Sequence, residues 1–203
     1  MTYEERLQKI VDIGYEIICY KIANGSVEIE NEASFQLQLS VVLQAIGKQF
    51  EFNTSDRFSL VLEKKYTDVK TAKSTNGNAR CDIYMKFEDI HNEDKTKSVI
   101  VELKFLREKE ASTDHRFSVL MDIENCEKYY EKDDTLSLAY CIVCCTETKY
   151  STKQKCSFSI GDGDTIKKDT YQYRKQEIQL NHDYNFSWNK YGDFQFMKLM
   201  VKK

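Results

Sequence analysis

Apolar residues recur at helical spacing in two segments near the start of the chain. In residues 3–22 and again in residues 32–48 they return every three or four positions, which is typical of a helix that buries one face. Asn31 stands where its side chain would cap the second helix. The predicted buried sides are Leu7, Ile10, Val11, Ile17 and Ile18 in the first helix and Phe35, Leu39, Val42, Leu43 and Ile46 in the second.

The middle of the chain changes to the pattern of strands. A polar loop over residues 67–79, with a turn at Asn76, follows the first strand, and the polar residues 91–97 predict an antiparallel hairpin between the next two. We expect the turn of this hairpin near residues 93–94. The predicted strands are residues 58–66 (FSLVLEKKY), 80–87 (RCDIYMKF) and 98–105 (SVIVELKF).

One more helix and further strands complete the pattern. Residues 114–131 have helical spacing, with Asp114 as a cap, and the apolar run 136–145 (LSLAYCIVCC) predicts a buried strand. The tail is rich in aromatic residues and polar turns. It predicts strands at 156–160, 170–180 and 193–201.

This order of elements indicates a mixed α/β sheet with helices packed on it. The chain has 203 residues, no proline and only seven glycines, so no flexible linker is expected and residues 1–203 should form a single domain. No apolar run is long enough to span a membrane, and the first residues, MTYEERLQKI, lack the pattern of a signal peptide. We therefore expect a cytoplasmic protein.

Charge is distributed unevenly along the chain. The formal net charge of −3 argues against a protein that coats nucleic acid. However, residues 1–32 hold seven acidic and three basic side chains, whereas residues 57–73 hold two acidic and five basic ones and residues 149–175 three acidic and seven basic ones. The basic stretches could contact phosphates, although a solvated surface explains either stretch equally well. Overall acidity therefore does not exclude a local nucleic-acid site.

Two ionisable residues, Glu102 and Lys104, interrupt the apolar strand SVIVELKF and share one of its faces. Both faces are otherwise apolar, so these charges are costly unless they are paired or bind a metal. On the preceding strand, Asp82 should lie opposite residue 104 or 105, a few positions from Glu102. Two converging carboxylates suit Mg²⁺, and a nearby lysine can orient a water. The alternative is a structural ion pair between Glu102 and Lys104.

Asp82, followed after nineteen residues by Glu102-Leu103-Lys104 at the end of an apolar strand, resembles the PD-(D/E)xK nuclease superfamily, the restriction-endonuclease-like phosphodiesterases. The resemblance covers about residues 31–145, whose predicted order matches the superfamily's αβββαβ core. An N-terminal helix precedes this core, and a β-rich extension over residues 146–203 follows it. The chain departs from the family pattern at Cys81, where members often have proline.

The resemblance implies that Asp82 and Glu102 hold Mg²⁺, for which Mn²⁺ could substitute, with the Leu103 carbonyl as a further ligand. Lys104 would serve the attacking water. Glu32 matches an acidic residue that many members carry on the helix before the first core strand, although an acid in a first turn is also favoured by the helix dipole. The candidates for supporting or phosphate contacts are Gln36, Arg80, Lys86, Asp122, Asn125, Lys128 and Tyr129.

The implied function is a Mg²⁺-dependent endonuclease that cleaves nucleic acid, DNA rather than RNA, in restriction or anti-phage defence. A homodimer would present one site to each strand. Two alternatives stay open. A nucleic-acid-binding or assembly module could retain the fold without catalysis, although the complete Asp, Glu and Lys set argues against it. An RNA-directed nuclease is the other, and no RNA-binding signature decides for or against it.

Overall fold

The computed structural model describes residues 1–74, 77–107, 112–156 and 158–203. The predicted turn residue Asn76 and the side chain of the predicted cap Asp114 lie outside the described part. The elements, in chain order, are α1 (Tyr3–Ala23), α2 (Glu32–Gln49), β1 (Asp56–Thr67), β2 (Asn78–Asp89), β3 (Asn92–Leu106), α3 (Ser112–Tyr130), β4 (Leu136–Cys145), α4 (Thr148–Ser151), β5 (Thr165–Ile166), β6 (Thr170–Tyr173), β7 (Gln176–Gln179), β8 (Tyr184–Asn185), β9 (Trp188–Tyr191) and β10 (Phe194–Val201).

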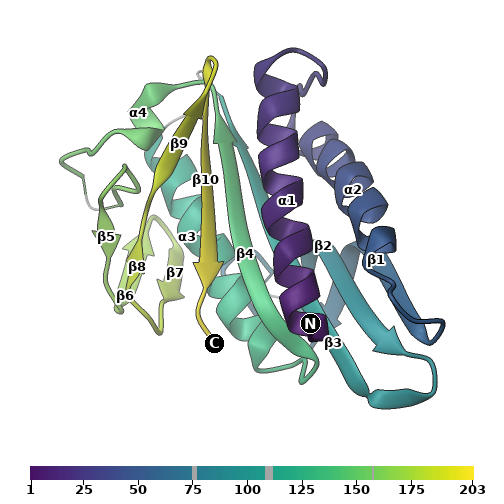
Figure 1. The fold of residues 1–203 in the computed structure, drawn as a ribbon. Coiled ribbons are helices and arrows are strands. Elements are labelled where there is room, and N and C mark those ends of the chain that lie inside the picture. Colours follow the sequence, from purple (N-terminus) through teal and green to yellow (C-terminus); the bar gives the residue numbers. More distant parts are fainter. Residues whose placement is uncertain (75–76, 108–111, 157) are drawn as a thin grey trace.

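One mixed sheet forms the centre of the described structure, with the strand order β1-β2-β3-β4-β10-β9 (Figure 1). β3 and β4 run parallel, and the other neighbouring pairs are antiparallel. Because parallel strands need a long crossover connection, α3 lies between β3 and β4 in the chain. The predicted α/β class is confirmed, and β9 and β10 show that residues after 145 also belong to the central sheet.

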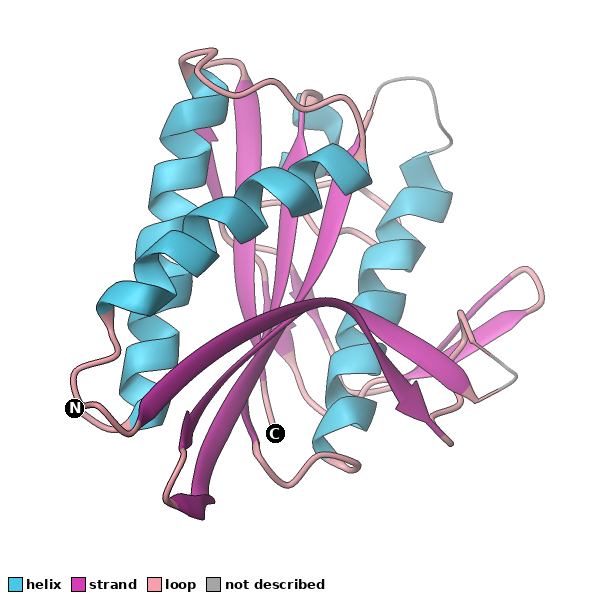
Figure 2. Cartoon of the chain, turned by 90° about the vertical axis from the view of Figure 1, so that its right-hand side faces the viewer, coloured by secondary structure: helices cyan, strands magenta, loops and turns pink. Residues whose placement is uncertain are grey.

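Helices cover both faces of the sheet, as Figure 2 shows. α1 and α2 bury their apolar sides on one face against β3 residues such as Val101 and Leu103. α3 covers the other face, where Ile100 of β3 points. The predicted buried sides are confirmed with two exceptions: Ile46 is only partly buried, and Ile17 is 37% exposed. Ile18 takes the inward position, and successive residues of a helix point about 100° apart, so Ile17 faces away from the sheet. None of the described helices is long and apolar enough to cross a membrane.

The N-terminal ends of α1 and α2 are capped by side chains. Asn31 Oδ1 accepts the backbone N–H of Ser34 at 2.8 Å, which confirms the predicted cap of α2. Thr2 caps α1 in the same way through the N–H of Glu5 at 3.2 Å. The cap of α2 sets where this helix begins, and Glu32 is therefore its first residue.

The predicted strand at residues 156–160 is wrong for the described residues of that stretch, which adopt no strand. The Asp164 carboxylate accepts hydrogen bonds from the Ser159 hydroxyl and, at 3.0 Å, from the Gly161 N–H. Within the stretch, the Ile160 carbonyl, which a strand would pair with a neighbour, instead accepts the Trp188 indole N–H at 2.6 Å. The stretch predicted at 170–180 is a hairpin of β6 and β7, and the predicted strand at 193–201 is confirmed as β10.

The β2–β3 hairpin turns earlier than the polar pattern predicted. Asp89 pairs with Asn92, and Asp89 Oδ1 accepts the N–H of His91 at 3.0 Å, so the turn is confined to Ile90 and His91. Residues 92–97, which were predicted as the turn, belong to β3. A short aspartate-stabilised turn is sufficient here, and the polar residues after it continue as an exposed end of the strand.

The shorter turn corrects the predicted register. Ile83 pairs with Val101, so the next positions along the two strands, Asp82 and Glu102, lie side by side. The prediction placed Asp82 opposite residue 104 or 105 instead. The observed register brings the two carboxylates closer together than predicted.

Candidate active site

Asp82 is held from β3 and from α2. Its Oδ2 accepts the backbone N–H of Leu103 on β3 at 2.6 Å. Its backbone carbonyl accepts the amide of Gln36 at 2.7 Å, and the same amide donates to Glu63 Oε1 at 2.9 Å. Glu63 is the β1 residue opposite Asp82 and has φ 54°, a left-handed conformation that interrupts the ladder. Gln36 therefore binds the backbone that carries Asp82.

Glu102 is buried, with 3% of its surface exposed, next to Asp82. Its Oε1 has no hydrogen-bond partner among the described residues. Burial and the nearby charges of Asp82 and Asp122 raise the pKa of Glu102 well above its ordinary value. Burial, followed by the charge of Asp122, also raises the pKa of Asp82 to about 6, although the Leu103 N–H opposes this. Burial and negatively charged neighbours thus disfavour the ionised form of both carboxylates.

Lys104 connects three elements. Its ammonium donates to Glu32 Oε2 on α2 at 2.8 Å and to the Leu103 carbonyl at 3.0 Å, and it lies 3.3 Å from Asp122 Oδ2 on α3. Burial disfavours this charge, but Asp122 and Glu32 outweigh burial and raise the pKa of Lys104 above its ordinary value. The lysine is therefore a fixed, protonated donor. The Leu103 carbonyl, which was predicted as a metal ligand, accepts one of the hydrogen bonds that Lys104 donates.

α3 contributes one side of the site. Asp122 is fully buried, and Asn125 and Tyr129 follow it one and two turns later on the same side of the helix. Asn125 Oδ1 and the Tyr129 hydroxyl have no hydrogen-bond partner among the described residues. Lys128 points elsewhere and pairs with Glu124 at 2.8 Å. The helical period therefore selects three of the four candidates on this helix.

These side chains surround a cavity of about 130 Å³. Seven of the twelve predicted site residues line it. Gln36, Leu103 and Asp122 are not among the described lining residues but contact Asp82 or Lys104, which are. Lys128 and Lys86 pair with Glu124 and Glu88 instead. Three lining residues, Thr71, Lys73 and Ser74, come from the loop between β1 and β2; none of them was a predicted site residue, although Lys73 belongs to the basic stretch at residues 57–73. The cavity is lined by Glu32, Thr71, Lys73, Ser74, Ala79, Arg80, Asp82, Glu102, Lys104, Asn125 and Tyr129.

The donor set fits a divalent cation. Asp82 and Glu102 offer two adjacent carboxylates, and Glu102 Oε1 is a buried acceptor without a donor among the described residues. Mg²⁺ commonly binds one or two carboxylates and keeps several waters. Within the described ranges, no group of three or more His, Cys, Asp or Glu side chains could hold a metal. A cation here would take Asp82 and Glu102 as ligands, with water in the rest of its shell.

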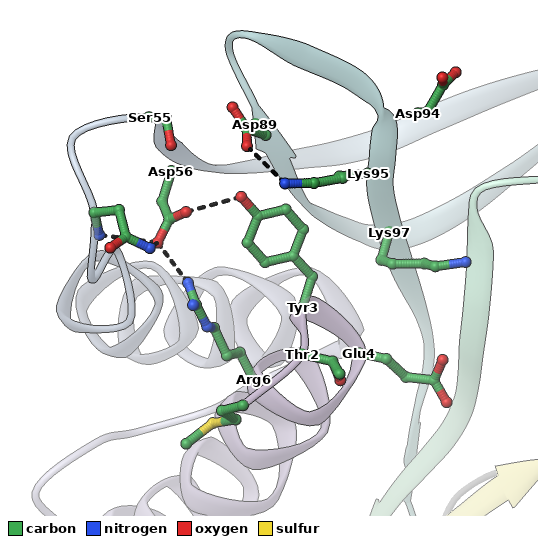
Figure 3. Close-up of a pocket in the computed structure, with 12 residues that line it drawn as sticks. Thr2, Tyr3, Glu4, Arg6, Ser55, Asp56, Asp89, Asp94, Lys95 and Lys97 are labelled. Carbon is green, nitrogen blue, oxygen red and sulfur yellow. Dashed lines mark hydrogen bonds and ion pairs between the residues drawn. The ribbon is translucent and has the colours of Figure 1, made fainter.

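A larger cavity of about 570 Å³ lies at the other end of the β1–β2 pair, next to the start of α1. As Figure 3 shows, Arg6 points toward Asp56 and Lys95 points toward Asp89. Asp56 accepts the Tyr3 hydroxyl at 2.8 Å and pairs with Arg6 at 2.6 Å, and Lys95 lies 3.6 Å from Asp89. The contacts of Tyr3 and Arg6 with Asp56 join α1 to β1, and the Lys95–Asp89 pair joins β3 to β2.

We expect Asp56→Asn to lower the free energy of unfolding by about 3 kcal/mol at pH 7, because it leaves buried Arg6 without its counter-charge. Burial opposes ionisation of Asp56, but hydrogen bonds from Arg6, Tyr3 and the Asn53 backbone lower its pKa from 3.8 to about 2. The stabilisation is therefore complete above pH 3.8 and is lost as the pH falls toward 2. Urea unfolding should therefore show a smaller difference in the free energy of unfolding between wild type and Asp56→Asn at pH 3 than at pH 7. The control Asp94→Asn changes an exposed residue and should unfold like the wild type. An equal loss of stability in this variant would contradict a specific role of the Asp56–Arg6 pair.

The fold thus brings Asp82, Glu102, Lys104 and Glu32 together from α2, β2 and β3 around one small cavity. The carboxylates are suited to a divalent cation, and the lysine is suited to an anionic ligand or a water beside it. Comparison with protein-family models, with curated proteins and with solved structures finds no match for this chain.

Proposed function

We propose that this protein is a Mg²⁺-dependent phosphodiesterase that hydrolyses nucleic acid, with DNA as the favoured substrate. The observation that carries the proposal is the buried pair Asp82 and Glu102 on neighbouring strands, with Lys104 on the same cavity. The order α2-β1-β2-β3-α3-β4 also matches the αβββαβ core of the restriction-endonuclease-like fold that the sequence resembles.

Each residue has a role that follows from its contacts. Asp82 and Glu102 would hold the cation, with the Leu103 carbonyl beside them, and Mn²⁺ should be able to substitute for Mg²⁺. Bound there, the cation polarises a phosphate oxygen and lowers the pKa of a water. Because its neighbours raise the pKa of Lys104, this side chain acts as a charged hydrogen-bond donor that orients the water, rather than as a base. Glu32 holds the ammonium in place at 2.8 Å.

The proposal includes a homodimer and a role in restriction or anti-phage defence. Each chain has one such cavity among its described residues, so two copies would supply one site for each strand of a duplex. The basic stretch at residues 149–175 offers positive charge for the phosphate backbone.

Purified protein should convert supercoiled plasmid to nicked or linear DNA in Mg²⁺ or Mn²⁺, and should not do so in EDTA. Linear duplex and single-stranded RNA are run in parallel, and cleavage of RNA alone would identify an RNA-directed nuclease instead. Glu102→Gln should be inactive, because it removes one of the two carboxylates. Glu88→Gln is the matched control on the same hairpin, since Glu88 pairs with Lys86 away from the cavity. Nucleic-acid binding without any cleavage would favour the non-catalytic module.

A further inference from the structure

Lys73 is a cationic side chain of the cavity to which the proposed chemistry gives no task. Its ammonium pairs with Asp122 Oδ1, while the other oxygen of Asp122 lies 3.3 Å from Lys104. The side chain of Lys73 is 31% exposed and that of Lys104 is 13% exposed. One buried carboxylate thus holds two lysines, of which Lys73 is the one nearer to solvent.

A tight turn packed on α3 presents Lys73 to the cavity. Thr71 and Ser74 exchange backbone hydrogen bonds of 3.2 and 3.1 Å, and the Thr71 hydroxyl accepts the Ser74 N–H at 3.0 Å. Thr71 is buried, and the Ala72 N–H lies 3.4 Å from Glu124 of α3. The backbone at Lys73 is therefore fixed by the hydrogen bonds of this turn and by its contact with α3.

The charge of the site depends on the cation. With every group ionised, four carboxylates and three cationic side chains carry a net charge of −1, and a divalent cation brings the sum to +1. A positive, partly desolvated cavity attracts anions. The carboxylates are Glu32, Asp82, Glu102 and Asp122, and the cationic side chains are Lys73, Arg80 and Lys104.

The size of the cavity limits what can enter it. Its volume of about 130 Å³ is well below the about 300–1,000 Å³ of typical ligand pockets. A phosphate group fits such a space, whereas the sugar and base of a nucleotide must stay outside. A cationic group at the solvent side of the cavity is then placed to meet a phosphate of the chain that lies across it.

We infer that Lys73 binds a backbone phosphate next to the bond that is cleaved, and that Asp122 positions its ammonium for this contact. An ammonium group has three donor hydrogens, so the bond to Asp122 leaves donors for phosphate oxygens. Hydrogen bonds between ionised partners of this kind are roughly twice as strong as neutral ones. This inference rests on the proposed function. It adds a substrate-binding residue, and it assigns Lys73 to affinity rather than to the chemical step.

The test compares Lys73→Met with Lys70→Met, which removes the same charge from the same loop at an exposed position that is not among the described lining residues. Binding of a fluorescent duplex is measured in Ca²⁺ at several salt concentrations, and plasmid cleavage is measured in Mg²⁺. Lys73→Met should weaken duplex binding about tenfold and raise KM with kcat changed less than about threefold. It should also reduce the salt slope of binding by about one, because one phosphate contact is lost.

Several outcomes would overturn the inference. They are wild-type affinity and salt slope in Lys73→Met, an equal loss in Lys70→Met, or a loss confined to kcat. If the wild type cleaves no nucleic acid, the proposed function fails, but inorganic phosphate in Ca²⁺ still tests Lys73. Calorimetry should then detect phosphate binding to the wild type and at least about tenfold weaker binding to Lys73→Met. Equal binding, or none by the wild type, would reject a phosphate site at Lys73.

Discussion

Lys104→Met is expected to lower kcat by roughly 10²–10³-fold while leaving the fold intact, because removing one fixed donor from a catalytic site commonly has an effect of this size. The lysine is held by Glu32, the Leu103 carbonyl and Asp122, so it needs no rearrangement to act. Methionine has a similar length and fills the same space without the charge. Asp122 keeps Lys73 as a partner after the substitution. Single-turnover cleavage in saturating Mg²⁺ measures the effect on the chemical step.

Lys198→Met provides the matched control. Lys198 is also a partly buried lysine on a strand of the central sheet, but it pairs with Asp12 of α1, away from the cavity. The Lys198→Met variant should cleave at the wild-type rate. The two lysine variants of the cavity should also differ in their kinetics: Lys104→Met should lower kcat, whereas Lys73→Met should raise KM. Full activity in Lys104→Met would remove this residue from the mechanism.

Local periodicity was enough to predict which side chains of β3 share a face. Val101 and Leu103 pack with α1 and α2 while Ile100 packs with α3, so Glu102 and Lys104 point to the α3 side as the alternation predicted. The same reasoning applies to the buried sides of the helices. These properties depend only on positions a few residues apart in the sequence.

Properties that depend on distant segments could not be predicted in the same way. The register between Asp82 and Glu102 depends on the length of the turn, and polarity alone did not show that the turn is confined to two residues. Choosing Asp122 over Lys128 required knowing how α3 is rotated on the sheet. Lys73 lies in a loop without periodicity, and only its pairing with Asp122 shows that it belongs to the site. The pairing of β10 with β4 joins strands that are about fifty residues apart in the chain.

Glu102→Gln is expected to stabilise the protein in EDTA, although it should abolish cleavage. Glu102 Oε1 is buried without a hydrogen-bond partner among the described residues, and Asp82 and Asp122 lie close enough to raise the pKa of Glu102. At neutral pH, folding therefore either buries a charge among like charges or protonates it, and both cost free energy. A neutral amide of the same shape avoids this cost. We expect the free energy of unfolding to rise by about 1–3 kcal/mol, which corresponds to a Tm increase of roughly 2–12 °C for a chain of this size.

Thermal unfolding in EDTA and in Mg²⁺ separates the two effects of this carboxylate. The Tm of the wild type should rise with Mg²⁺ concentration, because a ligand that binds only the folded state stabilises it, whereas the Tm of Glu102→Gln should not respond. Glu124→Gln is the control: Glu124 is equally buried, but it pairs with Lys128 and accepts the Gln179 N–H, so its amide variant should be less stable than the wild type. A destabilised Glu102→Gln in EDTA, or one that Mg²⁺ stabilises as much as the wild type, would show that Glu102 is a structural group and not a cation ligand. If Glu102→Gln is instead more stable than the wild type in EDTA while Glu124→Gln is less stable, Glu102 destabilises the fold without a cation. Its carboxylate would then serve cation binding and not stability.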